Sequence, residues 1–238
     1  MTPEILRDDR AKSFLQIGDL TTLIAEKHCG LTVDITTQQR WRELFGLLRE
    51  FDTLIDDTDI DDEQALLELE NFSTYAATYP SLSPLNLPDK NRRKLMLTVD
   101  NILQAGHSVS EATSPDSLII NRVEEGRLTA RLLEDSAQEE TTNNTLFESK
   151  FMPVMRSLGV TACLLDSLTD SYDDYSQGKI ATVPSIELYS KLAYGKLGFQ
   201  ALAHIPIMKH FSVMSMNRLQ NRLTHGSKPY SSLRIINQ

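Results

Sequence analysis

The sequence has little of what strands, disulfide scaffolds and membrane spans require. Glycine (10) and proline (9) are sparse among the 238 residues, and alternating Val/Ile/Thr segments are rare, so strands have little support. The two cysteines, Cys29 and Cys163, lie far apart and outside any paired motif, which excludes a disulfide framework. No apolar run reaches transmembrane length, and the first residues lack the basic and apolar regions of a signal peptide. We therefore expect a cytoplasmic protein in a reducing compartment.

What the sequence has in abundance is helical periodicity. Apolar residues recur at three- and four-residue steps, and the 40% hydrophobic content is enough for a sizeable core. We predict an all-α fold in a single domain over residues 1–238, with 225–238 as a flexible tail. The expected helices cover residues 3–16, 19–30, 36–57, 62–77, 89–105, 116–135, 145 to the acidic segment near 174, 186–203 and 207–223.

The charge of the chain is distributed unevenly. The formal net charge is −9, but the part from Lys179 onward has eight Lys/Arg and only one acidic residue, a balance of +7. The first 178 residues therefore carry −16. An acidic body argues against nucleic acid as a partner. The basic C-terminal region is compatible with peripheral contact to an anionic membrane surface or to a phosphate group. The alternative, which we favour, is that it is only the solvated face of the last helices.

Three aspartates mark the end of a strongly apolar helix. Asp166, Asp170 and Asp174 follow one another at four-residue steps, which places them on one helix face. Like charges at this spacing repel, and they repel more when partly buried. The stack therefore indicates a cation between the carboxylates, and the alternative is a solvated acidic helix end.

A second acidic pair lies more than a hundred residues earlier. Asp52 and Asp56 are also four residues apart, and they continue the apolar stripe that contains Trp41, Phe45 and Leu48. A buried ionised carboxylate is costly unless it is paired, bound to a metal or placed at a cavity. We therefore expect the two acidic helices to form opposing walls of one site.

Both segments resemble motifs of the squalene and phytoene synthases. Residues 48–57 read Leu-Arg-Glu-Phe-Asp-Thr-Leu-Ile-Asp-Asp, similar to the first aspartate-rich motif of squalene synthases. Residues 158–184 run from Leu-Gly through Asp166, Asp170 and Asp174 to Gly-Lys and a proline, similar to the second motif of that family. The separation, 118 residues from Asp52 to Asp170, also fits the family.

The resemblance implies an isoprenoid synthase-type helical bundle around a central apolar cavity. In that family the two motifs bind Mg²⁺ ions, which hold an allylic prenyl diphosphate and stabilise the departing diphosphate. By position, the residues that match metal ligands are Asp52, Asp56, Asp166, Asp170 and Asp174. Arg49 and Lys179 match positions that contact the diphosphate.

The chain also departs from the family pattern. Asp166 stands where the family has asparagine, and Thr169 stands where an arginine usually precedes the central aspartate. The tyrosine-rich segment expected between the motifs has no clear counterpart, because residues 120–133 contain no tyrosine. Only 64 residues follow Asp174, fewer than the family usually has, so we expect one or two closing helices of the family bundle to be absent.

Three functions are compatible with this pattern. The first is a Mg²⁺-dependent head-to-head condensation of C15 or C20 allylic diphosphates, as in squalene and phytoene synthases. The second is a class I terpene synthase acting on a single prenyl diphosphate, and the third is a non-catalytic relative that binds a lipid or a protein. The sequence leaves the substrate length, the product and the oligomeric state open.

Overall fold

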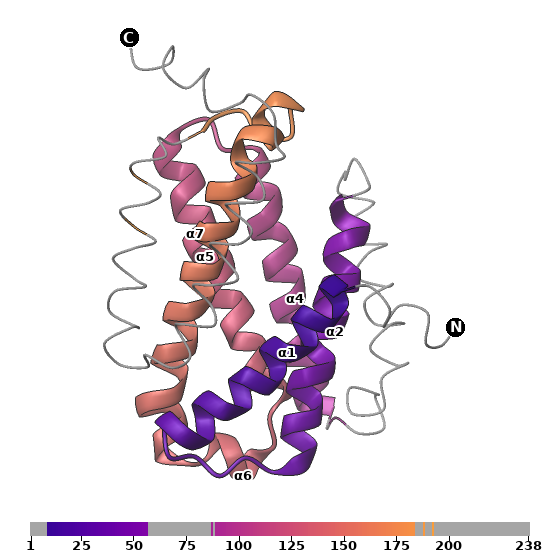
Figure 1. The fold of residues 1–238 in the computed structure, drawn as a ribbon, viewed down its shortest axis with the longest axis vertical. Helices are drawn as coiled ribbons and strands as arrows, with labels where there is room; N and C mark the ends of the chain where they lie inside the picture. Colours follow the sequence, from indigo (N-terminus) through magenta and orange to yellow (C-terminus); the bar gives the residue numbers. More distant parts are fainter. Residues whose placement is uncertain (1–8, 57–86, 88, 184–187, 189–191, 193–238) are drawn as a thin grey trace. The chain divides into compact units, whose positions relative to one another are not determined.

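The computed structural model describes residues 9–56, 87, 89–183, 188 and 192 (Figure 1). Of this part of the chain, 83% is helical and none is strand, which confirms the predicted all-α fold class. The helices expected at 62–77 and 207–223, nearly all of that at 186–203, and the expected tail at 225–238 lie outside the described residues. Within the described part, no helix is both long enough and apolar enough to cross a membrane.

The described chain consists of long α-helices and short helical segments (Figure 1). The long helices are α1 (Asp9–Leu23), α2 (Ile35–Asp56), α4 (Asp89–Ser110), α5 (Pro115–Ser136) and α7 (Met152–Ser176). The short segments are the π-helices η2 (Ile24–His28) and η3 (Phe147–Phe151) and the single-turn helix α6 (Glu139–Thr142).

Near the N-terminus the structure corrects the sequence prediction. A break was expected between residues 16 and 19, but α1 runs through Gly18 without interruption and continues into η2. Gly18 packs directly against α2, and a Cβ atom there would lie 2.4 Å from Cα of Arg42. This glycine allows two helix backbones to approach each other closely, so it is a packing residue rather than a helix terminator.

The described residues group into two compact units. Unit 1 contains the described residues within Met1–Leu103 and Leu128–Met155, and unit 2 contains those within Gln104–Arg127 and Arg156–Gln238. One apolar cluster of unit 1 contains Leu44, Leu47, Leu87, Leu95, Val99 and Leu132, all nearly inaccessible to solvent. The core of unit 2 contains Val109, Ala112, Leu118, Val160, Leu164 and Ile180.

In unit 1, the C-terminal end of α5 is capped by side chains from other helices. Trp41 donates its indole N–H to the carbonyl oxygen of Leu133 at 2.9 Å, and Arg40 donates to the carbonyl of Ser136 at 3.3 Å. Asn91 of α4 donates to the carbonyl of Ala137 at 3.3 Å. The last carbonyl groups of a helix have no partner within the helix, so these bonds satisfy groups that would otherwise be buried without a partner.

The N-terminus of α2 is joined to the start of α6 in a similar way. Asp34 accepts the backbone N–H of Thr37 at 2.9 Å, which is an N-cap, and its other oxygen accepts the hydroxyls of Thr37 and Thr141. The Thr37 hydroxyl in turn accepts the N–H of Gln138 at 3.0 Å. The polar segment 136–144, which lies between two of the predicted helices, is therefore an ordered connection that contains α6.

In unit 2, helices α5 and α7 pack backbone against backbone at a glycine. A Cβ atom on Gly126 would lie 2.6 Å from Cα and backbone N of Val160 and 2.7 Å from the carbonyl carbon of Gly159. Such distances are well below van der Waals contact, so only glycine fits at position 126 without displacing one of the helices.

Candidate functional site

Both acidic segments lie in long helices, as predicted. The backbone is helical at Arg49, Asp52 and Asp56, which occupy the last turns of α2. Asp166, Asp170 and Asp174 belong to the uninterrupted helix α7, where each lies about one helical turn from the next. The four-residue spacing in the sequence therefore corresponds to consecutive turns of real helices in both segments.

The end of α7 explains the Gly-Lys pair of the second motif. Gly178 has a φ of 76°, a left-handed conformation that strongly favours glycine. Its N–H donates to the carbonyl of Tyr175 at 3.1 Å, and the N–H of Lys179 donates to the carbonyl of Asp174 at 2.8 Å. This pair of hydrogen bonds is a Schellman motif, which ends the helix and holds the backbone of Lys179 next to the last turn.

The side chains of this region differ in exposure. Asp166 and Lys179 are exposed, and Asp174 is half-buried. The side chains of Arg49, Asp52, Asp56 and Asp170 lie outside the described part of the structure, and the two acidic segments belong to different units. We predicted that the two segments face each other across one site, and this stays a prediction.

The residue types suit a Mg²⁺ site, because this hard cation prefers carboxylate, phosphate and water oxygens. Asp166 and Asp174 are eight residues apart, or roughly 12 Å along a helix, too far to bind one ion without Asp170 between them. Among the described side chains, which exclude Asp52, Asp56 and Asp170, no group of three His, Cys, Asp or Glu residues could hold a metal ion.

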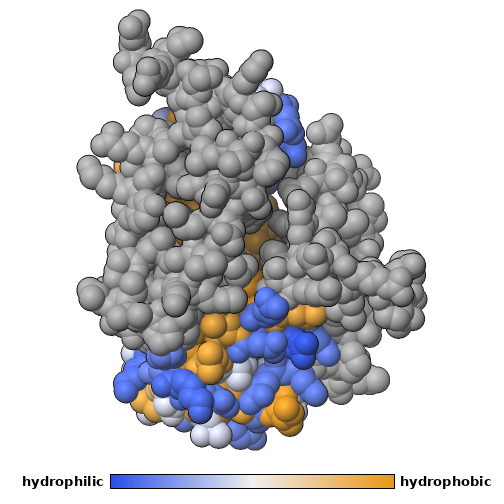
Figure 2. All heavy atoms as spheres, viewed as in Figure 1, coloured by the Kyte–Doolittle hydropathy of each residue, from blue (hydrophilic) through white to orange (hydrophobic). Residues whose placement is uncertain are grey.

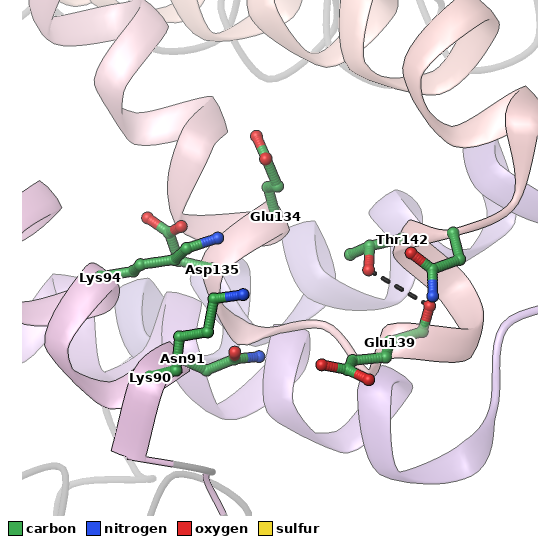
Figure 3. Close-up of a pocket in the computed structure, with 8 residues that line it drawn as sticks. Lys90, Asn91, Lys94, Glu134, Asp135, Glu139 and Thr142 are labelled. Carbon is green, nitrogen blue, oxygen red and sulfur yellow. Dashed lines mark hydrogen bonds between the residues drawn. The ribbon is translucent and has the colours of Figure 1, made fainter.

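A polar pocket in unit 1 has no counterpart in the sequence prediction. It has a volume of about 160 Å³ and lies among α4, α5, α6 and the residue after α6. Its lining is almost entirely polar and consists of Lys90, Asn91, Lys94, Glu134, Asp135, Glu139, Thr142 and Asn143. In Figure 3, Lys90 and Lys94 extend from α4 into the space between α4 and α6, with Thr142 across that space.

Asp135 is the most buried residue of this lining. It is 2% exposed, and its Oδ2 accepts the hydroxyl of Thr98 at 2.5 Å. The guanidinium of Arg131 lies 3.9 Å from the same oxygen. Burial raises the pKa of Asp135 above its ordinary value, although the bond from Thr98 and the charges of Arg131 and Lys94 act in the opposite direction.

The sequence contained one signal for this pocket. Lys90 and Lys94 are four residues apart in the first turns of a helix whose apolar stripe begins at Leu95. A lysine pair of this kind is usually a solvated face, so the spacing alone did not indicate a site.

We compared the chain with known proteins. No protein-family model, no curated protein and no solved structure matches it.

Proposed function

We propose that the protein is a Mg²⁺-dependent class I isoprenoid synthase that ionises an allylic prenyl diphosphate of the C15 or C20 class and condenses it head-to-head. The observation that carries the proposal is the placement of both aspartate-rich segments in long helices at one-turn spacing. Asp52 and Asp56 lie at the end of α2, and Asp166, Asp170 and Asp174 lie in α7.

The proposed roles follow from the chemistry of the residue types. The five aspartates supply carboxylate oxygens for Mg²⁺, whose charge stabilises the departing diphosphate when it is bound. Arg49 and Lys179 add positive charge for the diphosphate oxygens. The Schellman turn at Gly178 supports this role for Lys179, because it fixes the backbone beside Asp174.

The decisive experiment combines product analysis with ligand-dependent stability. Purified protein is incubated with Mg²⁺ and C10, C15 or C20 allylic diphosphates, and the organic products are identified by mass spectrometry. We expect a dimeric hydrocarbon or its cyclopropyl diphosphate precursor, and we expect Mg²⁺ plus diphosphate to raise the melting temperature.

Asp170→Asn is the informative variant, with Asp116→Asn as its control. Asp116 is an exposed acidic residue in the first turn of α5, outside both motifs. Asp170→Asn should abolish product formation and most of the ligand-dependent shift, while the metal-free protein stays at least as stable because one repelling charge is removed. If the substitution instead unfolds the metal-free protein, Asp170 is a structural residue and the catalytic assignment is wrong.

A second candidate is a class I terpene synthase that cyclises or quenches a single prenyl cation. The observation that favours it is the absence of tyrosine from residues 120–133, which lie within α5. A monomeric terpene as product would select this function. No product and no ligand-dependent shift would select a non-catalytic relative.

The location of the protein belongs to the same proposal. We place the enzyme in the cytoplasm, with its basic C-terminal region in peripheral contact with a membrane that dissolves the apolar product. Sedimentation with vesicles should then increase when anionic lipid is included and decrease at high salt.

A further inference from the structure

One exposed side of the first turns of α4 gathers positive charge. Lys90, Arg93 and Lys94 are all exposed, and the three- and four-residue steps between them place them on the same side of the helix. Leu97 follows on that side one turn later, and it is 58% exposed. We call these four residues the α4 face. It presents three cations and one apolar side chain to solvent together.

A neighbouring helix adds to the charge of the α4 face. Arg131 of α5 has a half-exposed side chain and lies near Lys94, because both act on the carboxyl group of Asp135. That carboxyl group is buried, so it presents little of its own charge at the surface. Glu134 and Glu139 lie at one edge, where they line the polar pocket beside the lysines. The balance over the exposed side of α4 itself is positive.

This arrangement of charge is unfavourable in the free protein. The helix dipole disfavours cations in the first turns of a helix, and Lys90 and Lys94 repel each other at their four-residue spacing. Neither Lys90 nor Arg93 forms an ion pair within the described part of the chain. The chain as a whole is acidic, with a net charge of −9. A cluster of exposed cations on an acidic protein indicates a partner with negative charge.

The exposed leucine decides between classes of partner. Apolar side chains are visible among hydrophilic ones elsewhere on the described surface (Figure 2), so the exposure of Leu97 alone indicates nothing. Beside three cations, however, it matches a surface that has anionic headgroups over an apolar layer. A nucleic acid presents its phosphates without such a layer, and an acidic protein repels it over longer distances.

We propose that the α4 face docks on an anionic phospholipid membrane, with its three cations on the headgroup phosphates and Leu97 at the boundary between headgroups and acyl chains. Each cation near such a surface increases binding roughly fivefold, so the contact is peripheral and reversible. The α4 face is separate from the basic C-terminal region and from the residues of the proposed synthase chemistry. Each of these assignments can therefore fail without the others.

The first test is sedimentation of the full-length protein with phosphatidylcholine vesicles, with and without phosphatidylserine. We expect binding that requires phosphatidylserine and decreases at high salt. Lys90→Gln/Arg93→Gln should weaken it roughly tenfold or more, because two of the contacting cations are lost. Lys27→Gln/Lys150→Gln is the matched control: it removes the same charge from two exposed lysines in the π-helices of unit 1 and should leave binding unchanged.

Two outcomes of this test would overturn the proposal. Equal weakening by the two double variants would show that only the net charge of the protein matters. Unchanged binding by Lys90→Gln/Arg93→Gln, or no binding by the wild type, would show that the α4 face is not a membrane contact. Binding of a DNA duplex as tightly as of the vesicles would replace the membrane with a general polyanion as the partner.

The second test follows Leu97 directly by fluorescence. Trp41 is the only tryptophan of the chain and is fully buried, so it gives a constant background. Leu97→Trp should show a blue shift of its emission when vesicles containing phosphatidylserine are added, because the indole enters an apolar layer. Ile120→Trp is the control, since Ile120 is 66% exposed on α5 outside the α4 face. The same response from both variants, or no shift from Leu97→Trp, would contradict the proposed orientation on the membrane.

Discussion

Trp41 of α2 donates its indole N–H to the carbonyl oxygen of Leu133, 92 residues later in the sequence, at 2.9 Å. The side chain is fully buried, and its ring stacks on Phe151 with 5.2 Å between the ring centroids and 16° between the planes. Trp41 therefore combines a large apolar contact with the one hydrogen bond that an indole can donate.

Replacing Trp41 with phenylalanine separates these two contributions. Trp41→Phe keeps an aromatic ring next to Phe151 but leaves the Leu133 carbonyl with only the long 3.4 Å bond from the Ser136 hydroxyl, at a cost of about 1–3 kcal/mol in the free energy of unfolding. Urea denaturation measures the loss. Trp41→Leu also removes the ring contact and should cost more. Equal stability of Trp41→Phe and wild type would show that the hydrogen bond contributes nothing.

Asp34 should stabilise the fold most strongly above its ordinary pKa. Burial raises the pKa of this carboxyl group, but hydrogen bonds from Thr37, Thr141 and Thr36 outweigh that effect and lower the pKa below 3.8. The stabilisation is present above the unfolded-state pKa and is lost as pH falls through the folded-state value. Asp34→Ala should cost about 1–2 kcal/mol at neutral pH, the loss expected for an N-cap, and much less at pH 2.

Thermal unfolding at several pH values checks this expectation, with Asp116→Ala as the control. Asp116 is exposed in the first turn of α5, so its loss should cost only a few tenths of a kcal/mol. A penalty for Asp34→Ala that does not change between pH 7 and pH 2 would contradict the assignment.

Asp135 should show the opposite dependence on pH. Its folded-state pKa is raised, chiefly by burial, so its contribution is most favourable below the unfolded-state pKa and is lost as pH rises through the folded-state value. Lys94 of α4 and Arg131 of α5 face this carboxyl group and limit the effect. We expect Asp135→Asn to keep an acceptor for Thr98 and to be relatively more stable at pH 7 than at pH 3, compared with wild type. A parallel pair of stability curves would show that Asp135 does not titrate differently on folding.

Two glycines of unit 2 form a matched pair for mutagenesis. Gly126→Ala would force a methyl group to 2.6 Å from the backbone of Val160, so we expect a loss of roughly 1–3 kcal/mol. Gly106 lies within α4, and a Cβ atom there would have open space around it, so Gly106→Ala should stabilise by about 0.5–1 kcal/mol. Chemical denaturation of both variants tests the close approach of α5 and α7. Similar effects of the two substitutions would contradict it.

Patterns local in the sequence predicted the helices well. The periodicity of apolar residues identified α2, α4, α5 and α7, and the aspartate spacing of both motifs falls on real helical turns. The break expected between residues 16 and 19 was wrong, because a glycine that ends a helix and a glycine that allows helix contact, such as Gly18, look the same in the sequence. Only the packing of α1 on α2 distinguishes the two cases.

Long-range partners could not be predicted. The segment 136–144 is polar and has the composition of a loop, yet Thr141 and Gln138 bond to residues more than 100 positions earlier. Asp135 likewise looks like an exposed residue at a helix end, and its burial depends on Thr98 of another helix. Whether the acidic segments of α2 and α7 face one another also depends on contacts between residues far apart in the sequence. It stays a prediction.

The cap of α5 has a consequence for how unit 1 folds. Its last carbonyl groups receive hydrogen bonds from Arg40, Trp41 and Asn91, residues between 46 and 96 positions away in the sequence. The chain must lose the entropy of closing these large loops before the final turn of α5 gains its partners. Formation of that turn therefore follows the docking of α2 and α4, and its amide protons should exchange with solvent only in the slow, cooperative opening of the whole unit.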